Sequence, residues 1–202
     1  MFGPLDVLNI ISSSVQIELS ILAATLDPVS TKIPPLFPDR QRELNAPGSD
    51  CGQSVVPTHT FASPPEKIDV LVVPGGFGNR DQTSAAPVIE FIRAVVPSKV
   101  RYLITVCTGS ALAAQAGVLD GKRATTNKRA FEHVRGLRKE VHWVRRARWV
   151  VDGHIWTSSG ISAGIDAMFA FVESLYGREL AHDTATRMEY VRNENWDEDP
   201  FA

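Results

Sequence analysis

Two continuous apolar runs, each ending in small or reactive residues, constrain the fold of this chain most. Ile68–Val73 runs into Pro74-Gly75-Gly76, and Val100–Val106 runs into Cys107-Thr108-Gly109. Strands that are buried on both faces of a parallel sheet have this uninterrupted apolar character. A helical pattern follows each run. Alternation of buried strands with helices predicts an α/β sandwich with a mostly parallel sheet.

Weaker patterns predict the remaining elements. Alternating apolar residues over 15–21 are typical of a strand with one buried face. Asp152-Gly153 between two short apolar runs predicts a hairpin. Helices are expected over residues 6–11, 85–96, 109–116, 129–138, 162–176 and 180–190. The Pro-, Ser- and Gly-rich segment 27–65 is expected to be loop with short edge strands. The amino-acid composition does not change along the chain in a way that would mark a second domain. Residues 1–202 are therefore expected to form a single domain.

Charge and composition exclude several classes of protein. The chain has 21 Lys and Arg against 23 Asp and Glu, and 44% of its residues are hydrophobic. This balance is unlike that of a disordered chain, and it gives no global attraction to nucleic acid or an anionic membrane. No apolar run approaches the roughly 20 residues of a membrane-spanning helix. With two cysteines and no secretory signal, a cytoplasmic protein is expected.

A basic stretch from Lys122 to Arg148 has two interpretations. It contains ten Lys and Arg residues and only two acidic ones. It could form an anion-binding face, but no recognisable nucleic-acid module accompanies it. We therefore expect a solvated surface, with its charge offset by acidic residues near the end of the chain, namely Glu194, Asp197, Glu198 and Asp199.

Cys107 is the strongest candidate for chemistry. A sharp strand-to-helix turn exposes a nucleophile above the sheet, as in the nucleophile elbow of hydrolases. There the thiol lies near the positive end of a helix dipole, which is expected to favour the thiolate. Gly75 and Gly76 end the neighbouring strand, where their backbone N–H groups could approach a developing oxyanion. The alternative is a cysteine that merely packs in the interior.

Other site chemistries have less support. Gly75-Gly76-Phe77-Gly78 has Asp81 where a dinucleotide-binding loop has its third glycine, and it lacks the Lys-Ser/Thr pair of a P-loop. The five histidines show no metal-binding spacing, so no metal is expected. A Cys/His dyad stays open, because its members are adjacent in space rather than in sequence.

Several segments together resemble the DJ-1/PfpI superfamily, and within it the isocyanide hydratase-like branch. These segments are VLVVPGGFG, ITVCTGSALAAQAGVLDGKRATTN and WVVDGHIWTSSGISAGIDAMFAFVESLYG. The resemblance implies a flavodoxin-like three-layer sandwich, a homodimer and no cofactor. Cys107 would be the nucleophile, Thr108 its neighbour at the oxyanion position, and Gly75, Gly76 and Gly109 would surround the substrate. The substrate would be a small electrophile, an isocyanide that is hydrated to an N-substituted formamide.

Two departures from the family pattern leave the activity open. Asn127 stands where a histidine is usual, and the acidic residue of the family's first strand would fall one position before Met1. The first strand is therefore expected to be missing, and Asp6 does not match the acidic position. Besides the enzyme, we keep a non-catalytic or redox-sensing binding module. The regulatory domain of a transcription factor is the weakest hypothesis, because no helix-turn-helix follows before Ala202.

Overall fold

A four-stranded sheet forms the centre of the molecule. The structure, a computed structural model, describes residues 2–32 and 49–202, so residues 33–48 of the expected loop lie outside the described part. The strands follow the order β5 (Ile68–Val73), β6 (Val100–Val106), β10 (Ile155–Ser158) and β9 (Trp149–Asp152). β5, β6 and β10 are parallel, and β9 pairs with β10 as the expected antiparallel hairpin. The prediction of a mostly parallel sheet is confirmed.

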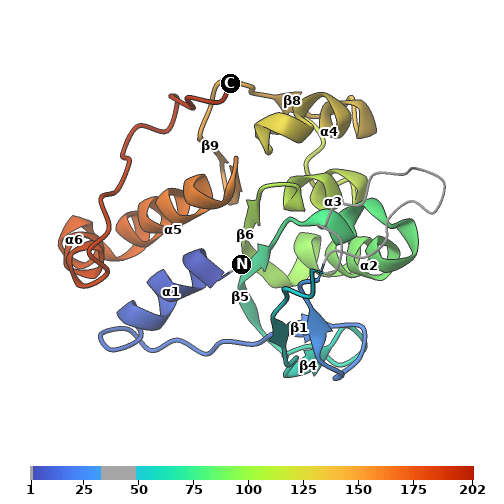
Figure 1. The fold of residues 1–202 in the computed structure, drawn as a ribbon, viewed down its shortest axis with the longest axis horizontal. Helices are drawn as coiled ribbons and strands as arrows, with labels where there is room; N and C mark the ends of the chain where they lie inside the picture. Colours follow the sequence, from blue (N-terminus) through green and yellow to red (C-terminus); the bar gives the residue numbers. More distant parts are fainter. Residues whose placement is uncertain (1, 33–48) are drawn as a thin grey trace.

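Helices cover both faces of the sheet (Figure 1). One face carries α1 (Phe2–Ile11), α5 (Ile161–Tyr176) and α6 (Arg178–Arg187). The other carries α2 (Gln82–Lys99) and α3 (Gly109–Gln115), and α4 (Phe131–Leu137) packs on α3. This arrangement is the expected three-layer α/β sandwich. No helix in the described ranges is long and apolar enough to cross a membrane.

The sheet separates two apolar cores because successive strand residues point to opposite faces. In β6, Leu103 belongs to the core shared with α2 and α3. The next residue, Ile104, belongs to the core shared with α1, α5 and α6. Trp149 and Trp156 are buried in this second core, where Trp156 lies edge-on to Phe171. Both cores therefore hold the sheet rigid beneath the ends of its strands.

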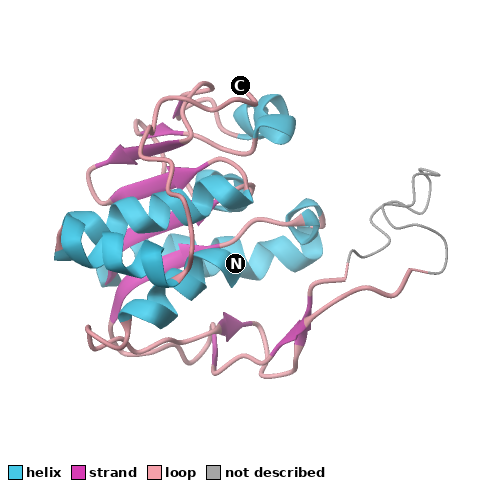
Figure 2. Cartoon of the chain, turned by 60° about the vertical axis from the view of Figure 1, so that its left-hand side comes forward, coloured by secondary structure: helices cyan, strands magenta, loops and turns pink. Residues whose placement is uncertain are grey.

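The predicted strand over residues 15–21 is wrong. The pairing there is limited to β1 (Leu22–Ala23), which runs parallel to β4 (His59–Thr60). An extended segment needs a hydrogen-bonded neighbour to become a strand, and within the described ranges β5 pairs with β6 alone. The other short elements are β2 (Val29–Ser30), β3 (Ser54–Val55), β7 (Arg123–Ala124), β8 (His142–Trp143), η1 (Phe77–Arg80) and η2 (Lys128–Ala130). Figure 2 shows that β2 and β3 lie outside the sandwich.

Two residues of the basic stretch are buried, which corrects the expectation of a solvated surface for them. The Arg148 guanidinium donates from Nε (2.8 Å) and from a terminal nitrogen (2.6 Å) to Asp166 Oδ2. The Asp166 Oδ1 atom accepts from the Tyr190 hydroxyl at 2.9 Å and from the Asn193 backbone at 3.0 Å. The Asp166 side chain is fully buried. Lys128 is the second buried base.

Candidate active site at Cys107

Cys107 lies at the sharp turn between β6 and α3, as the sequence predicts. Its φ angle is 58°, in the left-handed region that costs a non-glycine residue about 1–3 kcal/mol. Three hydrogen bonds hold its backbone in this conformation. The Cys107 N–H donates to Ser158 O at 3.1 Å, and the hydroxyls of Ser110 and Thr126 each donate to Cys107 O at 3.1 Å. The strained turn is therefore fixed from β10, from α3 and from the segment before η2.

The glycine turn after β5 packs directly on the cysteine turn. A Cβ atom on Gly75 would lie 2.6 Å from Thr108 N and 2.8 Å from Cys107 Cβ. A Cβ atom on Gly109 would collide with the backbone carbonyl of Val73. Both positions thus require glycine for the two turns to meet. The structure brings Gly75, Gly109 and Cys107 together as expected.

Gly76 has a different role from the one expected. Its backbone N–H donates to Thr108 Oγ1 at 3.0 Å, and the Thr108 hydroxyl lies 3.3 Å from Gly76 O. The Asn79 amide also donates to Thr108 O at 3.1 Å. In this structure Thr108 therefore occupies the N–H that was expected to face an oxyanion, and the contact ties the two turns together.

Two polar residues, Thr108 and Asn127, act on the Cys107 thiol and lower its pKa through hydrogen bonding. The Asn127 Oδ1 atom accepts from the backbone of Arg129 at 3.1 Å and of Ala130 at 3.3 Å, which caps η2. This cap fixes the Asn127 side chain and leaves its amide nitrogen outside the cap. Neither neighbour is a histidine or a carboxylate. The sequence identified Asn127 only as a departure from a pattern, since its contact with Cys107 depends on the fold.

The prediction that the turn favours a thiolate is wrong for the protein at rest. Burial raises the pKa of the Cys107 thiol, because an anion loses hydration in the interior. Hydrogen bonds from Thr108 and Asn127 act in the opposite direction and lower this pKa, but burial is the larger effect. The α3 helix has only seven residues, so its dipole is short. Cys107 therefore rests as a protonated thiol at neutral pH.

Alkylation of Cys107 should report this protonation state. In a Cys51→Ser variant, which removes the exposed second thiol, the iodoacetamide rate should rise with pH. Its midpoint should lie above the ordinary thiol value of about 8.5. A cysteine tripeptide measured in the same buffers is the control. A protein midpoint below that of the tripeptide would contradict the effect of burial.

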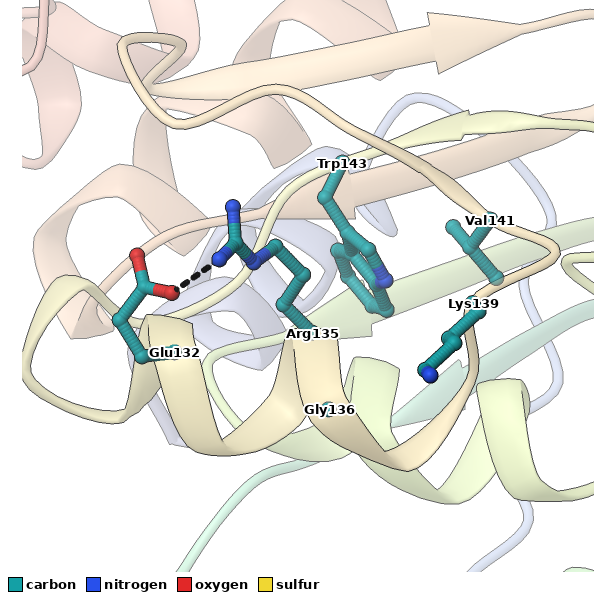
Figure 3. Close-up of a pocket in the computed structure, with 6 residues that line it drawn as sticks. All are labelled: Glu132, Arg135, Gly136, Lys139, Val141 and Trp143. Carbon is teal, nitrogen blue, oxygen red and sulfur yellow. Dashed lines mark ion pairs between the residues drawn. The ribbon is translucent and has the colours of Figure 1, made fainter.

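A separate surface hollow lies against α4 and β8 (Figure 3). Its volume is about 430 Å³, and its lining residues are Glu132, Arg135, Gly136, Lys139, Val141 and Trp143. Arg135 and Glu132 form an ion pair of 2.8 Å, and the indole of Trp143 lies between Arg135 and Lys139. The lining contains no cysteine, serine or threonine and none of the predicted site residues. In residues 2–32 and 49–202, no group of three or more His, Cys, Asp or Glu residues is placed to hold a metal ion.

The model of the DJ-1/PfpI family matches residues 10–174. The isonitrile hydratase of Pseudomonas putida is 35% identical over 143 residues, which cover 71% of this chain and 60% of that protein. The HTH-type transcriptional regulator CdhR of Pseudomonas aeruginosa is 32% identical over 128 residues, or 58% of this chain and 34% of the regulator. The chain thus spans less than two thirds of the length of these relatives.

Solved structures show the same architecture. A ThiJ/PfpI family protein from Pseudomonas syringae superposes with a TM-score of 0.69 at 26% identity, covering 95% of this chain and 69% of that chain. An AraC family transcriptional regulator from Pseudomonas putida reaches a TM-score of 0.70 at 19% identity, covering 92% and 90%. The second likeness supports the fold alone.

Proposed function

Because the chain belongs to the DJ-1/PfpI family, we propose that it is a cysteine-dependent hydratase that converts isocyanides to N-substituted formamides. The observation that carries this proposal is Cys107 itself, held at positive φ between a strand and a helix and packed against the Gly75 turn. The 35% identity to an isonitrile hydratase supports the choice of substrate class. No cofactor takes part in the proposed reaction.

The proposed chemistry uses the thiol and one water molecule. The Cys107 sulfur bonds to the terminal carbon of the isocyanide, and the thiol proton moves to that same carbon. The product of this step is a thioimidate, in which sulfur, hydrogen and a C=N bond share one carbon. Water then adds with its oxygen on carbon and one proton on nitrogen. The C–S bond breaks, the second water proton returns to sulfur, and the N-substituted formamide leaves.

The raised pKa of Cys107 suits this sequence of steps. A protonated thiol carries the hydrogen that the isocyanide carbon must gain, so no separate acid is needed in the first step. The amide of Asn127 and the hydroxyl of Thr108 stabilise the sulfur as its proton leaves. Gly75, Gly76 and Gly109 bring the two turns together beside the sulfur.

Incubation with a small aryl isocyanide tests the proposal directly. The purified protein should produce the corresponding N-aryl formamide, detected by mass spectrometry with one oxygen from ¹⁸O-labelled water. Product should form catalytically, with many equivalents per protein chain. A single equivalent that remains bound to Cys107, or no product from a folded sample, would contradict the hydratase.

A non-catalytic or redox-sensing module is the second candidate. Two observations favour it: the groups that hydrogen-bond to the thiol are an amide and a hydroxyl rather than a carboxylate, and transcriptional regulators are among the relatives. This candidate predicts reversible oxidation of Cys107 or a ligand-dependent rise in melting temperature without turnover. Catalytic formation of a formamide would exclude it.

The proposed assembly follows the family. We propose that residues 1–202 act as one domain within a homodimer and that the substrate is a small electrophile. The expected cytoplasmic location and the absence of nucleic acid from its partners belong to the same proposal. Light scattering of the purified chain would measure the oligomeric state.

A further inference from the structure

The buried amine of Lys128 lies directly behind the cysteine site. Its side chain is 4% exposed, and its Nζ atom has three oxygen acceptors. These are Ala147 O at 2.7 Å, Thr125 Oγ1 at 2.9 Å and Thr126 O at 3.3 Å. Asp199 Oδ2 lies 3.5 Å from the same nitrogen, and its side chain is 1% exposed. Lys128, which was expected to be solvated, is thus buried among four oxygen atoms.

Lys128 is hydrogen-bonded to the segment that contacts Cys107. Lys128 is the first residue of η2, and it holds the two residues before Asn127 through a hydroxyl and a carbonyl. Thr126 in turn donates to Cys107 O at 3.1 Å, and Asn127 lowers the pKa of the Cys107 thiol through hydrogen bonding. Movement of Lys128 would therefore shift both groups that reach Cys107 from this segment.

Asp199 is the carboxylate that pairs with the buried amine of Lys128. Burial lowers the pKa of Lys128 and is the larger effect, whereas the charge of Asp199 acts in the opposite direction and raises this pKa. Among the described residues, Asp199 Oδ2 is buried without a hydrogen-bond partner, while its Oδ1 accepts from Phe201 N at 3.0 Å. A buried ammonium left without its anion is strongly unfavourable. The carboxylate thus stabilises Lys128 in its buried position.

The segment that carries Asp199 is fastened along the edge of the sheet. Trp196 O accepts from the backbone of Arg148 at 2.7 Å and of Trp149 at 3.3 Å. Asp199 N donates to Arg146 O at 3.0 Å. Figure 1 shows this segment crossing from α6 to the vicinity of β9 and β8. It lies beyond residues 10–174, the part matched by the family model.

We propose that Asp199 is a positioning residue for the Cys107 site. Through Lys128 it holds Thr126 and η2 in place, so that Thr126 keeps its hydrogen bond to Cys107 O and Asn127 keeps its position relative to the thiol. The inference deepens the proposed function, in which Asn127 stabilises the sulfur during the reaction. Its effect on the thiol can be measured without any turnover.

A double-mutant cycle between positions 199 and 127 tests the proposal. All variants carry Cys51→Ser, and the readout is the pH profile of Cys107 alkylation. Asp199→Asn should raise the thiol pKa by about one unit, the scale expected for loss of one hydrogen bond to the thiolate. In an Asn127→Ser background, where serine still caps η2 but lacks the amide, the same change should have no such effect.

The cycle separates positioning from direct electrostatics. Loss of the Asp199 charge acting through space would lower the thiol pKa, and it would do so equally in both backgrounds. Asp197→Asn makes the same charge change at an exposed position of the segment and should leave the profile unchanged. Equal shifts in both backgrounds, or no shift with Asp199→Asn, would overturn the proposal.

A second variant covers failure of Asp199→Asn to fold. Lys128→Met with Asp199→Leu removes both charges, and buried pairs replaced in this way often keep their stability. It should give the same Asn127-dependent rise in thiol pKa, and an unchanged pKa would overturn the proposal. Because iodoacetamide reports the thiol, absence of hydratase activity would reject the proposed function but leave this test intact.

Discussion

Cys107→Ser is expected to reduce formamide production by at least about 10³-fold, the scale of losses when a nucleophile is removed. A serine hydroxyl is a far weaker nucleophile than sulfur, and the groups that hydrogen-bond to it, Asn127 and Thr108, include no base to activate it. The change replaces one atom, so the turn with its positive φ should persist. Initial rates with an aryl isocyanide at saturating concentration provide the measurement.

The matched control is Cys51→Ser, which makes the same chemical change at an exposed position. This variant should retain the full rate. Circular dichroism and the melting temperature should show that both variants fold. A Cys107→Ser protein within tenfold of the wild-type rate would show that the sulfur does not carry the reaction.

Asp166→Ala is expected to lower the free energy of unfolding by about 3–5 kcal/mol, because it leaves the Arg148 guanidinium buried without its anion. The change also removes the acceptor of the Tyr190 hydroxyl and of Asn193 N. Four hydrogen bonds to one carboxylate are thus lost at once. Urea unfolding followed by fluorescence, at constant slope, measures the difference.

The exposed pair of Asp183 and Arg187 provides the control. The side chains of Asp183 and Arg187 are 53% and 52% exposed, and Arg187 Nε lies 3.0 Å from Asp183 Oδ2 on α6. Asp183→Ala should change the free energy of unfolding by less than about 1 kcal/mol, as is usual for surface ion pairs. Similar losses for the two variants would indicate that burial does not set the strength of the Arg148 pair.

Local sequence patterns predicted the part of the site that depends on neighbouring residues in the chain. The apolar runs ending at Gly75 and Cys107 identified two parallel strands, and the small residues after Cys107 identified the helix start. Parallel strands end at the same edge of a sheet, so the meeting of the two turns also followed. The hairpin at Asp152-Gly153 was confirmed for the same reason, since its turn type requires glycine at φ 63°.

The remaining features depend on contacts between distant residues. Lys128 and Asp199 looked like members of two solvated charge clusters, because charge patterning does not reveal which side chains become buried. The strand over residues 15–21 failed for a related reason, since alternation shows which face could be buried but not whether a partner strand lies alongside. The shift of the thiol pKa is opposite to the predicted one because the burial of the sulfur depends on packing. A position at the end of a strand does not specify that burial.

The left-handed conformation of Cys107 places stability and reactivity in opposition during the evolution of this chain. Glycine would relieve the backbone strain at φ 58°, yet glycine has no sulfur. Selection for thermal stability alone would therefore favour replacement of Cys107 by glycine and loss of the reactive sulfur. This is a trade-off between stability and activity. Persistence of cysteine at this position in thermally adapted descendants would be a record of continued selection for its chemistry.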